Sequence, residues 1–415
     1  MRFLLLFILL PLSLTAQRTL SGTVIDAADG HPLSFVSVFL KSNQSRGVLT
    51  NERGQFSLKV SEEELKDQLV FSLLSYQTEE VMLQPLGTGD SIINQQLTTS
   101  FLELAEITVI SDLGLRALIR KVISKIPDNY GADKYLLKGY SRKFSIDDGE
   151  YSQVIESMIT LKDTRYEDPA KKPKAWIDQF RKSDYQGNAR EDIRLSSNGR
   201  HTLLSGYQSM IDNPARAHTI HWLGMLDGKL DNMTFANRGE YVSNGDTLVK
   251  IQYGLTRNKL GINDAQREAY ASYLTGVVLI NKSDFAMVRN TQGQLDKGWY
   301  RDIVYHKVNG KYYPKKISAE IQYNYNNRLQ TSYQTSLLYI TEVIPDPKAI
   351  KQAKKGKLLV FEGTLGSIKA DYNPNFWANN EILQLLPAPE ALQTGLEKIK
   401  ALEEQYRENA RRVKE

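Results

Sequence analysis

Short stretches in which apolar and polar residues alternate, separated by turn residues, recur along most of this chain. Residues 19–25 show the pattern, in which every second side chain faces the same side of a strand. Turn-forming pairs such as Asp29-Gly30 and Asn309-Gly310 lie between stretches of this kind. The spacing predicts a mainly β protein with some α-helix, because short strands at regular intervals favour sandwiches and antiparallel sheets.

The first sixteen residues are typical of a secretory signal peptide. Arg2 supplies a positive charge, residues 3–14 are almost continuously apolar, and the small residue Ala16 precedes the expected cleavage point. The alternative is an N-terminal membrane anchor, but spanning a bilayer needs about 20 apolar residues. No later stretch approaches that length, so we expect an exported mature chain without a transmembrane helix.

The absence of cysteine excludes disulfides, thiolate metal sites and a cysteine nucleophile. An exported chain of this kind must therefore be stabilised by burial of its cores alone, which two sizeable domains can provide. The net charge of +5 comes from 53 basic and 48 acidic residues. So small an excess does not indicate a dedicated nucleic-acid binder.

Linked motifs in the first hundred residues define an N-terminal domain over residues 17–98. They are Gly22-Thr23-Val24-Ile25-Asp26, Gly30-His31-Pro32-Leu33, Val36-Ser37-Val38, Gly54-Gln55-Phe56-Ser57-Leu58 and Leu69-Val70-Phe71-Ser72. In this order they resemble a carboxypeptidase regulatory-like domain, a Greek-key β-sandwich of the transthyretin-like type. Pro32 would fix a turn entry, Gly54 would allow a left-handed residue, and Phe56 would fill the core. One departure is Ser75, where the family usually has glycine.

The resemblance implies no peptidase activity, because the regulatory-like domain lies beside the peptidase in that family and carries no catalytic residues. The chain has no zinc-peptidase motif of its own. The next segment, residues 99–112, is predicted as a linker strand. Residues 102–110 resemble the strand that closes the same domain in TonB-dependent receptors, but the remaining chain is too short for the receptor barrel. This strand either simply connects the domains or pairs with a partner's sheet edge.

A second, β-rich domain is predicted over residues 113–362. It opens with an amphipathic helix over residues 111–126, in which Leu115, Ile119 and Val122 share one face and which Pro127 ends. Strands are predicted over residues 135–144, 151–161, 240–252, 273–281, 285–294, 302–308, 311–322 and 329–343. Between them, about residues 163–235 are polar and irregular, which predicts an insertion with helical fragments.

Short pieces of the later strands carry a second resemblance. They are Thr275-Gly276-Val277-Val278-Leu279-Ile280-Asn281, Asp284-Phe285-Ala286-Met287 and Lys311-Tyr312-Tyr313-Pro314. Together they resemble envelope proteins whose curved antiparallel sheet wraps a helix, as in lipoprotein-carrier folds. The resemblance implies a curved antiparallel sheet with helices, and an apolar ligand pocket inside it.

Residues 363–415 are predicted as a C-terminal tail that ends in an amphipathic helix over residues 390–412. One stripe of this helix contains Leu392, Leu396, Ile399, Leu402 and Tyr406. The stripe should pack on the chain's own domain, or alternatively on a partner.

The candidate ligand-binding residues are tyrosines of the late strands. They are Tyr312, Tyr323, Tyr325, Tyr333 and Tyr339. Tyrosine combines a flat apolar face with a hydroxyl, which suits the lining of a pocket or contact with a sugar ring. The alternative is packing within the sheet.

The candidate metal ligands are His218 and His221, which would share one face of a helix. A zinc site needs a third protein ligand, and no HExxH spacing is present. The sequence also lacks a GxSxG elbow, a P-loop and a GxGxxG fingerprint. We therefore predict no metal, no cofactor and no catalytic residues.

These features predict a non-enzymatic protein of the Gram-negative cell envelope, in the periplasm or associated with the outer membrane. Its expected partner is an envelope protein, a lipid or a glycan, and its curved sheet would hold an apolar ligand. A scaffold that binds partners without a small ligand is the first alternative. A metal-dependent hydrolase that uses His218 and His221 is the second.

Overall fold

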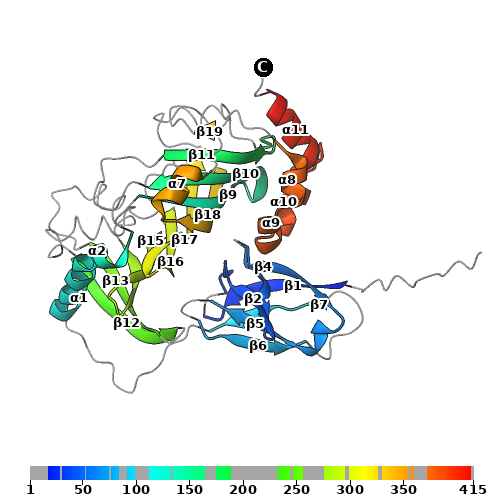
Figure 1. Cartoon of the computed structure of the whole chain (residues 1–415). Coiled ribbons are helices and arrows are strands. Elements are labelled where there is room, and N and C mark those ends of the chain that lie inside the picture. The colour runs from blue at the N-terminus through cyan, green and yellow to red at the C-terminus, as the bar shows by residue number, and fades with distance from the viewer. Residues whose placement is uncertain are drawn as a thin grey trace, which may run out of the picture. The chain divides into compact units, whose positions relative to one another are not determined.

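The computed structural model divides the chain into two compact units (Figure 1). The first contains Met1–Ser100 and Asn380–Pro389, and the second contains Phe101–Asn379 and Glu390–Glu415. The structure describes residues 17–28, 30–51, 53–73, 76–83, 91–98, 112–131, 134–163, 174–187, 230, 233–243, 246–255, 275–294, 299–325, 330–353, 357–358 and 372–412. The predicted signal peptide and residues 102–110 lie outside these ranges.

In its described residues, the first unit is a β-sandwich of two four-stranded sheets. One sheet has the order β4-β1-β7, with β8 also paired to β1, and the other has the order β3-β2-β5-β6. The strands are β1 (Gln17–Asp26), β2 (Ser37–Leu40), β3 (Asn43–Leu49), β4 (Gln55–Ser61), β5 (Gln68–Ser72), β6 (Glu79–Met82), β7 (Ser91–Ile92) and β8 (Gln95–Leu97), with a 3-10 turn η1 (Glu64–Lys66). The mainly β fold class and its N-terminal sandwich are confirmed.

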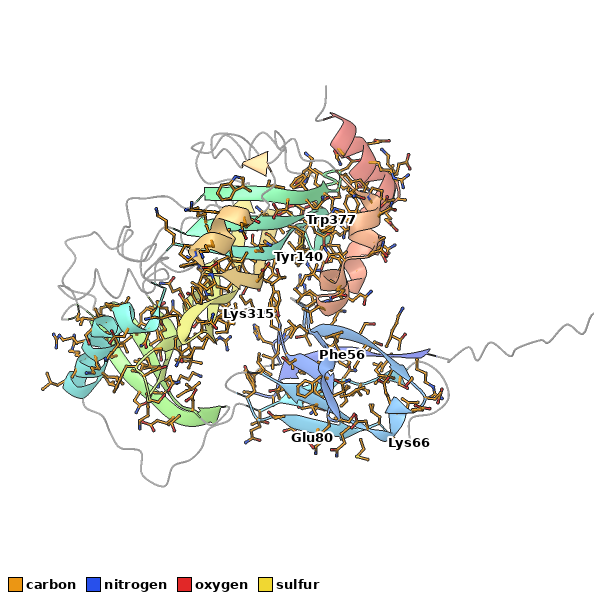
Figure 2. The ribbon with its side chains drawn as sticks, viewed as in Figure 1. Phe56, Lys66, Glu80, Tyr140, Lys315 and Trp377 are labelled. Carbon is orange, nitrogen blue, oxygen red and sulfur yellow. The ribbon has the colours of Figure 1, made fainter. Side chains whose placement is uncertain are left out.

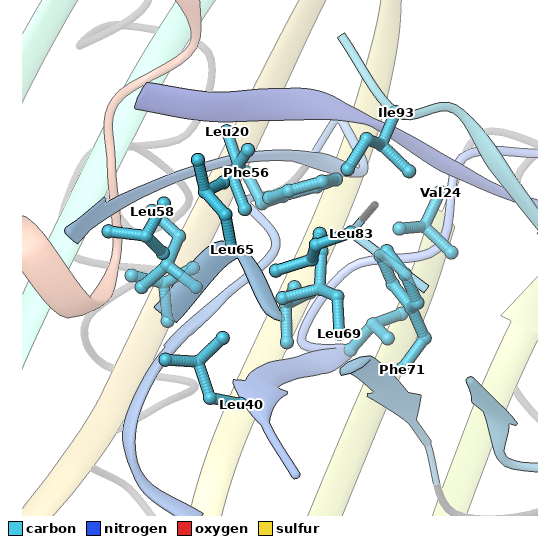
Figure 3. Packing of buried hydrophobic residues seen from close by; sticks show 14 of the residues in the cluster. Leu20, Val24, Leu40, Phe56, Leu58, Leu65, Leu69, Phe71, Leu83 and Ile93 are labelled. Atoms are coloured by element: carbon cyan, nitrogen blue, oxygen red, sulfur yellow. The ribbon is translucent and has the colours of Figure 1, made fainter. Parts of the chain in front are cut away.

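The core of the sandwich consists of inward-facing side chains from both sheets (Figure 3). Phe56 from β4 and Phe71 from β5 pack edge to face, with ring centroids 5.5 Å apart. Leu20, Leu40 and Leu69 are fully buried around them. Phe56 thus fills the core as its position in the motif implies.

A short helix from the distant C-terminal segment completes the first unit. Helix α9 (Glu381–Leu385) packs against β3, and its side chain Ile382 and the following Leu386 are buried. Asn380 begins the helix, because its Oδ1 accepts a hydrogen bond from the Ile382 amide at 3.1 Å. Part of the predicted tail, residues 363–415, therefore belongs with the N-terminal sandwich. The packing of α9 on the sandwich could not be predicted from the sequence, since no local pattern indicates which sheet a distant helix will cover.

We expect Gly54→Ala to destabilise the sandwich more than Gly30→Ala. Both glycines have φ near +73°, where an alanine costs about 1–2 kcal/mol. At Gly54 a Cβ would also lie 2.4 Å from the Val24 carbonyl oxygen, whereas nothing lies within 4 Å of a Cβ at Gly30. Thermal unfolding followed by circular dichroism measures the difference. Equal losses would show that the contact with Val24 has no effect.

The second unit contains a curved antiparallel sheet that has 11 strands among the described residues. Its order is β12-β13-β14-β15-β16-β17-β18-β9-β10-β11-β19. The strands are β9 (Tyr135–Asp147), β10 (Glu150–Asp163), β11 (Lys174–Lys182), β12 (Met233–Ser243), β13 (Asp246–Leu255), β14 (Gly276–Asn281), β15 (Met287–Gln294), β16 (Trp299–Val308), β17 (Lys311–Tyr325), β18 (Gln330–Ile344) and β19 (Lys357–Leu358). Because β18 pairs with β9, the last long strand lies beside the first.

Two predicted segments of this sheet are divided differently in the structure. Residues 240–252, predicted as a strand with a hairpin turn at Asn244-Gly245-Asp246, cover parts of two strands, β12 and β13, which form a hairpin with Tyr241 opposite Leu248. The predicted insertion over residues 163–235 contains β11, which pairs with β10. The polar residues of β11 obscured its alternation, although Ala175 and Ile177 are buried on one side. Residues 164–173 and 188–229 of the insertion lie outside the described part.

The second unit also contains six described helices. They are α1 (Asp112–Ser124), α2 (Ile126–Asn129), α7 (Pro347–Gln352), α8 (Pro374–Ala378), α10 (Glu390–Leu396) and α11 (Leu402–Arg412). The predicted apolar face of α1 is confirmed, since Leu115, Ile119 and Val122 are buried. Pro127 does not end the helical path, because it lies in the first turn of α2, where a missing amide hydrogen costs little. Among the described helices, none combines the length and apolar character that a membrane crossing requires.

The predicted terminal helix over residues 390–412 is two helices, and Ile399 lies in the break between them. Its side chain is 88% exposed, so it is not part of the packed stripe. The side chain of Gln405 stabilises the break, because its Nε2 donates to the carbonyl oxygens of Leu396 at 2.8 Å and Lys400 at 2.6 Å. Leu392, Leu396 and Tyr406 are buried as the stripe predicts.

Candidate functional site

The strand register sorts the side chains of the large sheet onto two faces. Residues directly opposite each other on neighbouring strands face the same side, and successive residues along a strand alternate sides. We call the side that contains Glu156 the Glu156 face and the side that contains Ile317 the Ile317 face. Both faces contain buried polar residues.

One row of the Glu156 face crosses seven adjacent strands. From β15 to β11 it reads Thr291, Asp302, Ser318, Leu337, Arg142, Glu156 and Arg181. The row brings two buried carboxylates into the middle of the sheet, each close to two cations. At about 4.8 Å per strand, four steps put the Cα atoms of Asp302 and Glu156 about 19 Å apart.

Glu156 is the centre of the first ionic cluster. Its carboxylate accepts a hydrogen bond from Arg181 Nε at 2.7 Å and another from the hydroxyl of Tyr140, and Arg142 lies directly opposite. Burial alone would raise the pKa of Glu156, but Arg181, Arg142 and the two hydrogen bonds together hold it below its usual value. Glu156 is therefore ionised at neutral pH although only 3% of it is exposed.

The C-terminal helices cover this cluster. The guanidinium of Arg181 lies over the rings of Trp377 and Tyr406, 4.4 and 4.9 Å from their centroids. Helix α10 packs on β10 and α11 on β11, on the part of the sheet near Trp377 (Figure 2). Leu392 and Leu396 join the apolar cluster around Val154. The terminal helices thus pack on the chain's own sheet.

Asp302 is the centre of the second ionic cluster. Arg289 donates to its two oxygens at 2.9 and 3.2 Å, and Lys316 Nζ lies 2.7 Å from Oδ2. Burial would raise the pKa of Asp302, but these two cations hold it well below its usual range. Both buried carboxylates are thus held ionised by paired cations, which suits a structural role better than proton transfer near neutral pH.

The Ile317 face is largely apolar in its central row. From β13 to β11 the row reads Ile251, Val278, Asn290, Ile303, Ile317, Leu338, Ser141, Ser157 and Phe180. All of these side chains are buried. The five steps from Ile251 to Leu338 make a band about 24 Å long, interrupted only by Asn290.

The neighbouring row of the same face is mixed. From β12 to β10 it reads Phe235, Tyr253, Gly276, Gln292, Arg301, Ala319, Ser336, Lys143 and Ile155. Two cations, Arg301 and Lys143, are each only 2% exposed. The Ile317 face therefore places buried positive charge beside a long apolar band.

Helix α2 packs over one end of the Ile317 face. Tyr130, which follows the helix, exchanges hydrogen bonds with the backbone of Met287, donating to its oxygen at 2.7 Å and accepting from its amide at 2.9 Å. Its ring packs against Tyr305 and Tyr312, with centroids 5.7 and 6.0 Å away. Tyr305 belongs to the same side of β16 as Ile303, so these contacts fix the helix on that face.

Two of the five predicted tyrosines, Tyr312 and Tyr339, have described side chains, and their surroundings differ. Tyr312 donates a hydrogen bond to Asp284 Oδ2 at 3.0 Å, near α2. Tyr339 lies on the Glu156 face, opposite Tyr140, with Lys315 Nζ 4.4 Å from its ring centroid. The side chains of three candidates are outside the described part: Tyr323, Tyr325 and Tyr333. A ligand role for the five stays a prediction.

Sequence analysis did not single out Lys143, Arg301 or Glu156. In the segment Ser141-Arg142-Lys143-Phe144 of β9, charged residues stand on both sides of the strand, so alternation could not tell a solvated face from a buried one. The adjacent pair Arg301-Asp302 of β16 has the same ambiguity, since its two charges belong to opposite faces. The strand register was needed to sort them.

The predicted metal ligands, His218 and His221, lie outside the described residues. Within the described ranges, no three histidine or carboxylate side chains gather closely enough to hold a metal ion. The metal prediction is therefore untested.

A known protein family matches the N-terminal part of the chain: residues 20–109 match the family model of the CarboxypepD_reg-like domain. This segment is a carboxypeptidase regulatory-like domain. The motif-based prediction is confirmed, and the described strands β1–β8 of the regulatory-like domain form its sandwich. No curated protein matches the chain.

Solved structures with some likeness to the chain include three bacterial proteins. An outer membrane lipoprotein-sorting protein domain from Vibrio parahaemolyticus is 10% identical, with a TM-score of 0.29, over 54% of this chain and 90% of that one. A DUF1329 family protein from Desulfovibrio piger is 10% identical, with a TM-score of 0.24, over 56% and 93%. A LolA superfamily protein from Nitrosomonas europaea is 8% identical, with a TM-score of 0.22, over 58% and 97%. Values this low do not define a shared function.

Proposed function

We propose that this protein is a non-enzymatic binding protein of the bacterial cell envelope, which holds a ligand with an apolar chain against the Ile317 face. The observation that carries the proposal is the row in which Ile251, Val278, Ile303, Ile317 and Leu338 stand opposite one another. This band is about 24 Å long and is apolar on every strand except β15, where Asn290 stands in the row.

The energetics favour a long apolar chain as the ligand. Each methylene group removed from water contributes about 0.8 kcal/mol. A chain of about ten methylenes therefore gains up to about 8 kcal/mol before the entropic cost of binding is subtracted. The side chains of the row are buried, so a ligand reaches them only when the elements that cover them move. Among the described elements, helices α1 and α2 lie at one end of this face.

The envelope location rests on the sequence of the first sixteen residues, which has the charge, apolar core and small terminal residue of an export signal. The periplasmic side of the outer membrane and the cell surface are both compatible with that signal. Cell fractionation with an antibody against the regulatory-like domain would distinguish these locations from the cytoplasm. A full-length, uncleaved product in the cytoplasm would contradict the proposal.

The partner-binding scaffold is less well supported. In this alternative, the terminal helix or residues 102–110 would be the segment that binds the partner. Helices α10 and α11 pack on β10 and β11 of their own sheet, which uses the apolar stripe of that segment. Residues 102–110 lie outside the described part.

Binding of a neutral fluorescent probe tests the function. We expect N-phenyl-1-naphthylamine to bind the full chain saturably and to be displaced by 1-dodecanol. Ala319→Phe should weaken displacement by about tenfold or more, because the added ring fills the Ile317 face. Ser318→Phe is the matched control, since the neighbouring residue faces the other side of β17.

Two results would contradict the proposal. One is that the wild-type chain binds neither the probe nor dodecanol. The other is that both phenylalanine variants fold, as judged by circular dichroism, and bind dodecanol equally well. Organic extraction of protein purified from envelopes, followed by mass spectrometry, would then identify any chain that the protein carries.

A further inference from the structure

Helix α1 turns one face to solvent, opposite the face that packs on the sheet. Its exposed residues are Leu113, Ala117, Arg120, Lys121 and Ser124. At about 100° per residue, all five fall within an arc of about 100° around the helix axis. We call these five residues the outer face of α1. The outer face therefore combines one large apolar side chain at the start of the helix with two cations farther along.

The charge of this helix is one-sided. Residues 113–127 contain four cations and no carboxylate, although the whole chain has 53 basic and 48 acidic residues. Two of the four cations, Arg120 and Lys121, belong to the outer face. The helix thus carries a local positive excess that the average composition of the chain does not have.

More positive charge gathers where α1 meets α2. Lys125 forms an ion pair with Asp128 at 2.6 Å, and Lys311 Nζ donates to the backbone oxygen of Asp128 at 2.6 Å. The hydrogen bond and charge of Lys125, and then the charges of Lys311 and Lys121, lower the pKa of Asp128. Three lysines therefore share the field of one exposed carboxylate, and positive charge is in excess around it.

The lysines of the neighbouring hairpins do not extend this excess. Lys282 is paired with Glu240 at 2.9 Å, and Lys307 is paired with Asp284 at 2.9 Å. Each pair is neutral, so the positive surface is limited to α1, α2 and Lys311. We call the outer face of α1 together with Lys125 and Lys311 the α1 patch.

Leu113 indicates what kind of anionic surface the α1 patch fits. Its side chain is 75% exposed, which is unusual for a leucine in the described part of the chain. Surfaces that bind at the membrane interface place cations against the lipid phosphates and an apolar side chain at the edge of the acyl region. A nucleic acid would use the cations but offers no apolar layer for Leu113.

We propose that the α1 patch docks the protein on a membrane surface that contains anionic phospholipids. Arg120, Lys121 and the lysines around Asp128 meet the phosphate groups, and Leu113 enters the edge of the acyl region. The other side of α1 contacts the Ile317 face, because the Arg116 guanidinium lies 5.6 Å from the ring centroid of Phe235. Docking thus brings lipid next to a helix that lies at one end of that face.

Vesicle flotation tests the docking surface on the full chain. We expect binding to vesicles of phosphatidylcholine mixed with phosphatidylglycerol, and at least about tenfold weaker binding to phosphatidylcholine alone. Raising the salt from about 0.1 M to about 1 M shortens the Debye length from about 10 Å to about 3 Å, so it should weaken binding to the mixed vesicles. The first sixteen residues are the same in every variant below, so their own affinity for lipid does not affect the comparison.

Substitutions then assign the binding to α1. The double variant Arg120→Gln, Lys121→Gln should bind the mixed vesicles about twentyfold more weakly, since each basic residue near an anionic surface contributes about fivefold. Leu113→Ser should weaken binding about tenfold, because the apolar contact is lost. The double variant Lys66→Gln, Lys398→Gln is the matched control, which removes the same charge from two exposed lysines outside the patch. This control should change the affinity less than about twofold.

Each contrary result overturns a definite part of the proposal. Equal binding to vesicles with and without phosphatidylglycerol, or no binding to either, overturns the anionic membrane surface. Full binding by α1 variants that fold, as judged by circular dichroism, overturns the assignment to α1. Equal weakening by the control variant shows that net charge alone acts and overturns the docking surface. None of these results depends on the apolar site, which displacement of the fluorescent probe by 1-dodecanol measures separately.

Discussion

Glu156→Gln is expected to lower the free energy of unfolding of the second unit by about 3–5 kcal/mol. The substitution removes the carboxylate that accepts hydrogen bonds from Arg181 and Tyr140, and it leaves Arg142 opposite a neutral side chain. Arg142 is only 1% exposed, so water cannot replace the lost partner without a change in packing. Most of the expected loss is the penalty of leaving buried cations uncompensated.

Tryptophan fluorescence during urea unfolding measures this effect. All four tryptophans, among them Trp377 against Arg181, belong to the second unit, so the signal does not report the sandwich. Glu150→Gln is the control on the same strand, because Glu150 pairs with Lys398 at the surface and should contribute no more than about 1 kcal/mol. Equal losses in the two variants would show that the buried cluster contributes no more to the free energy of unfolding than a surface ion pair.

Replacing the whole cluster should have a different result from breaking it. When Arg142, Glu156 and Arg181 are all replaced by apolar residues of similar volume, no buried charge is left without a partner. We expect this triple variant to be clearly more stable than Glu156→Gln alone. The comparison separates the penalty of an uncompensated charge from the net contribution of the ion pairs.

Asp302→Asn is expected to have an effect of similar size, about 3–5 kcal/mol, with a marked dependence on pH. The variant leaves Lys316, which is 5% exposed, and Arg289 without their shared carboxylate. The folded pKa of Asp302 lies well below the unfolded value of 3.8. A depressed carboxyl pKa stabilises the fold above the unfolded value, and this contribution is lost as the pH falls further.

The slope of stability against pH tests the role of Asp302. Below about pH 4 the wild type should lose up to about 1.4 kcal/mol per pH unit through this carboxyl alone, because the unfolded chain binds a proton that the folded chain does not. Asp302→Asn should lack that contribution and show a shallower slope. Asp128→Asn, which removes an exposed carboxylate paired with Lys125, is the control and should change the slope much less, because solvent screens this surface pair. A slope of Asp302→Asn equal to that of the wild type would contradict the role.

Local chemistry made much of the fold predictable. Gly54 has the positive φ that its turn position implies, Phe56 is buried in the sandwich, and the helix face of Leu115, Ile119 and Val122 is packed. Each of these features depends on neighbours within a few residues, where backbone sterics and periodicity operate. The regulatory-like domain could be identified for the same reason, since its motifs are local turns and strands in a fixed order.

The candidate site could not be predicted in the same way. Asp302 and Lys143 look like any charged residue of a strand, and only pairing decides which face and which neighbours they meet. The row from Arg301 to Lys143 joins strands that are more than 150 residues apart in the chain, because β18 pairs with β9. The break at Ile399 has a related cause, since a side chain from the next helix satisfies the carbonyls at that point.

Local patterns in the sequence were enough to predict most strands, the turns and the sandwich of the regulatory-like domain, because each follows from the conformational preferences of adjacent residues. The tertiary structure alone decided which charges are buried together and which row of side chains is apolar. It also decided that α9 joins a sandwich whose strands lie more than 280 residues earlier in the chain. Strand register and helix packing are long-range choices, set by the summed burial of many side chains rather than by any local pattern.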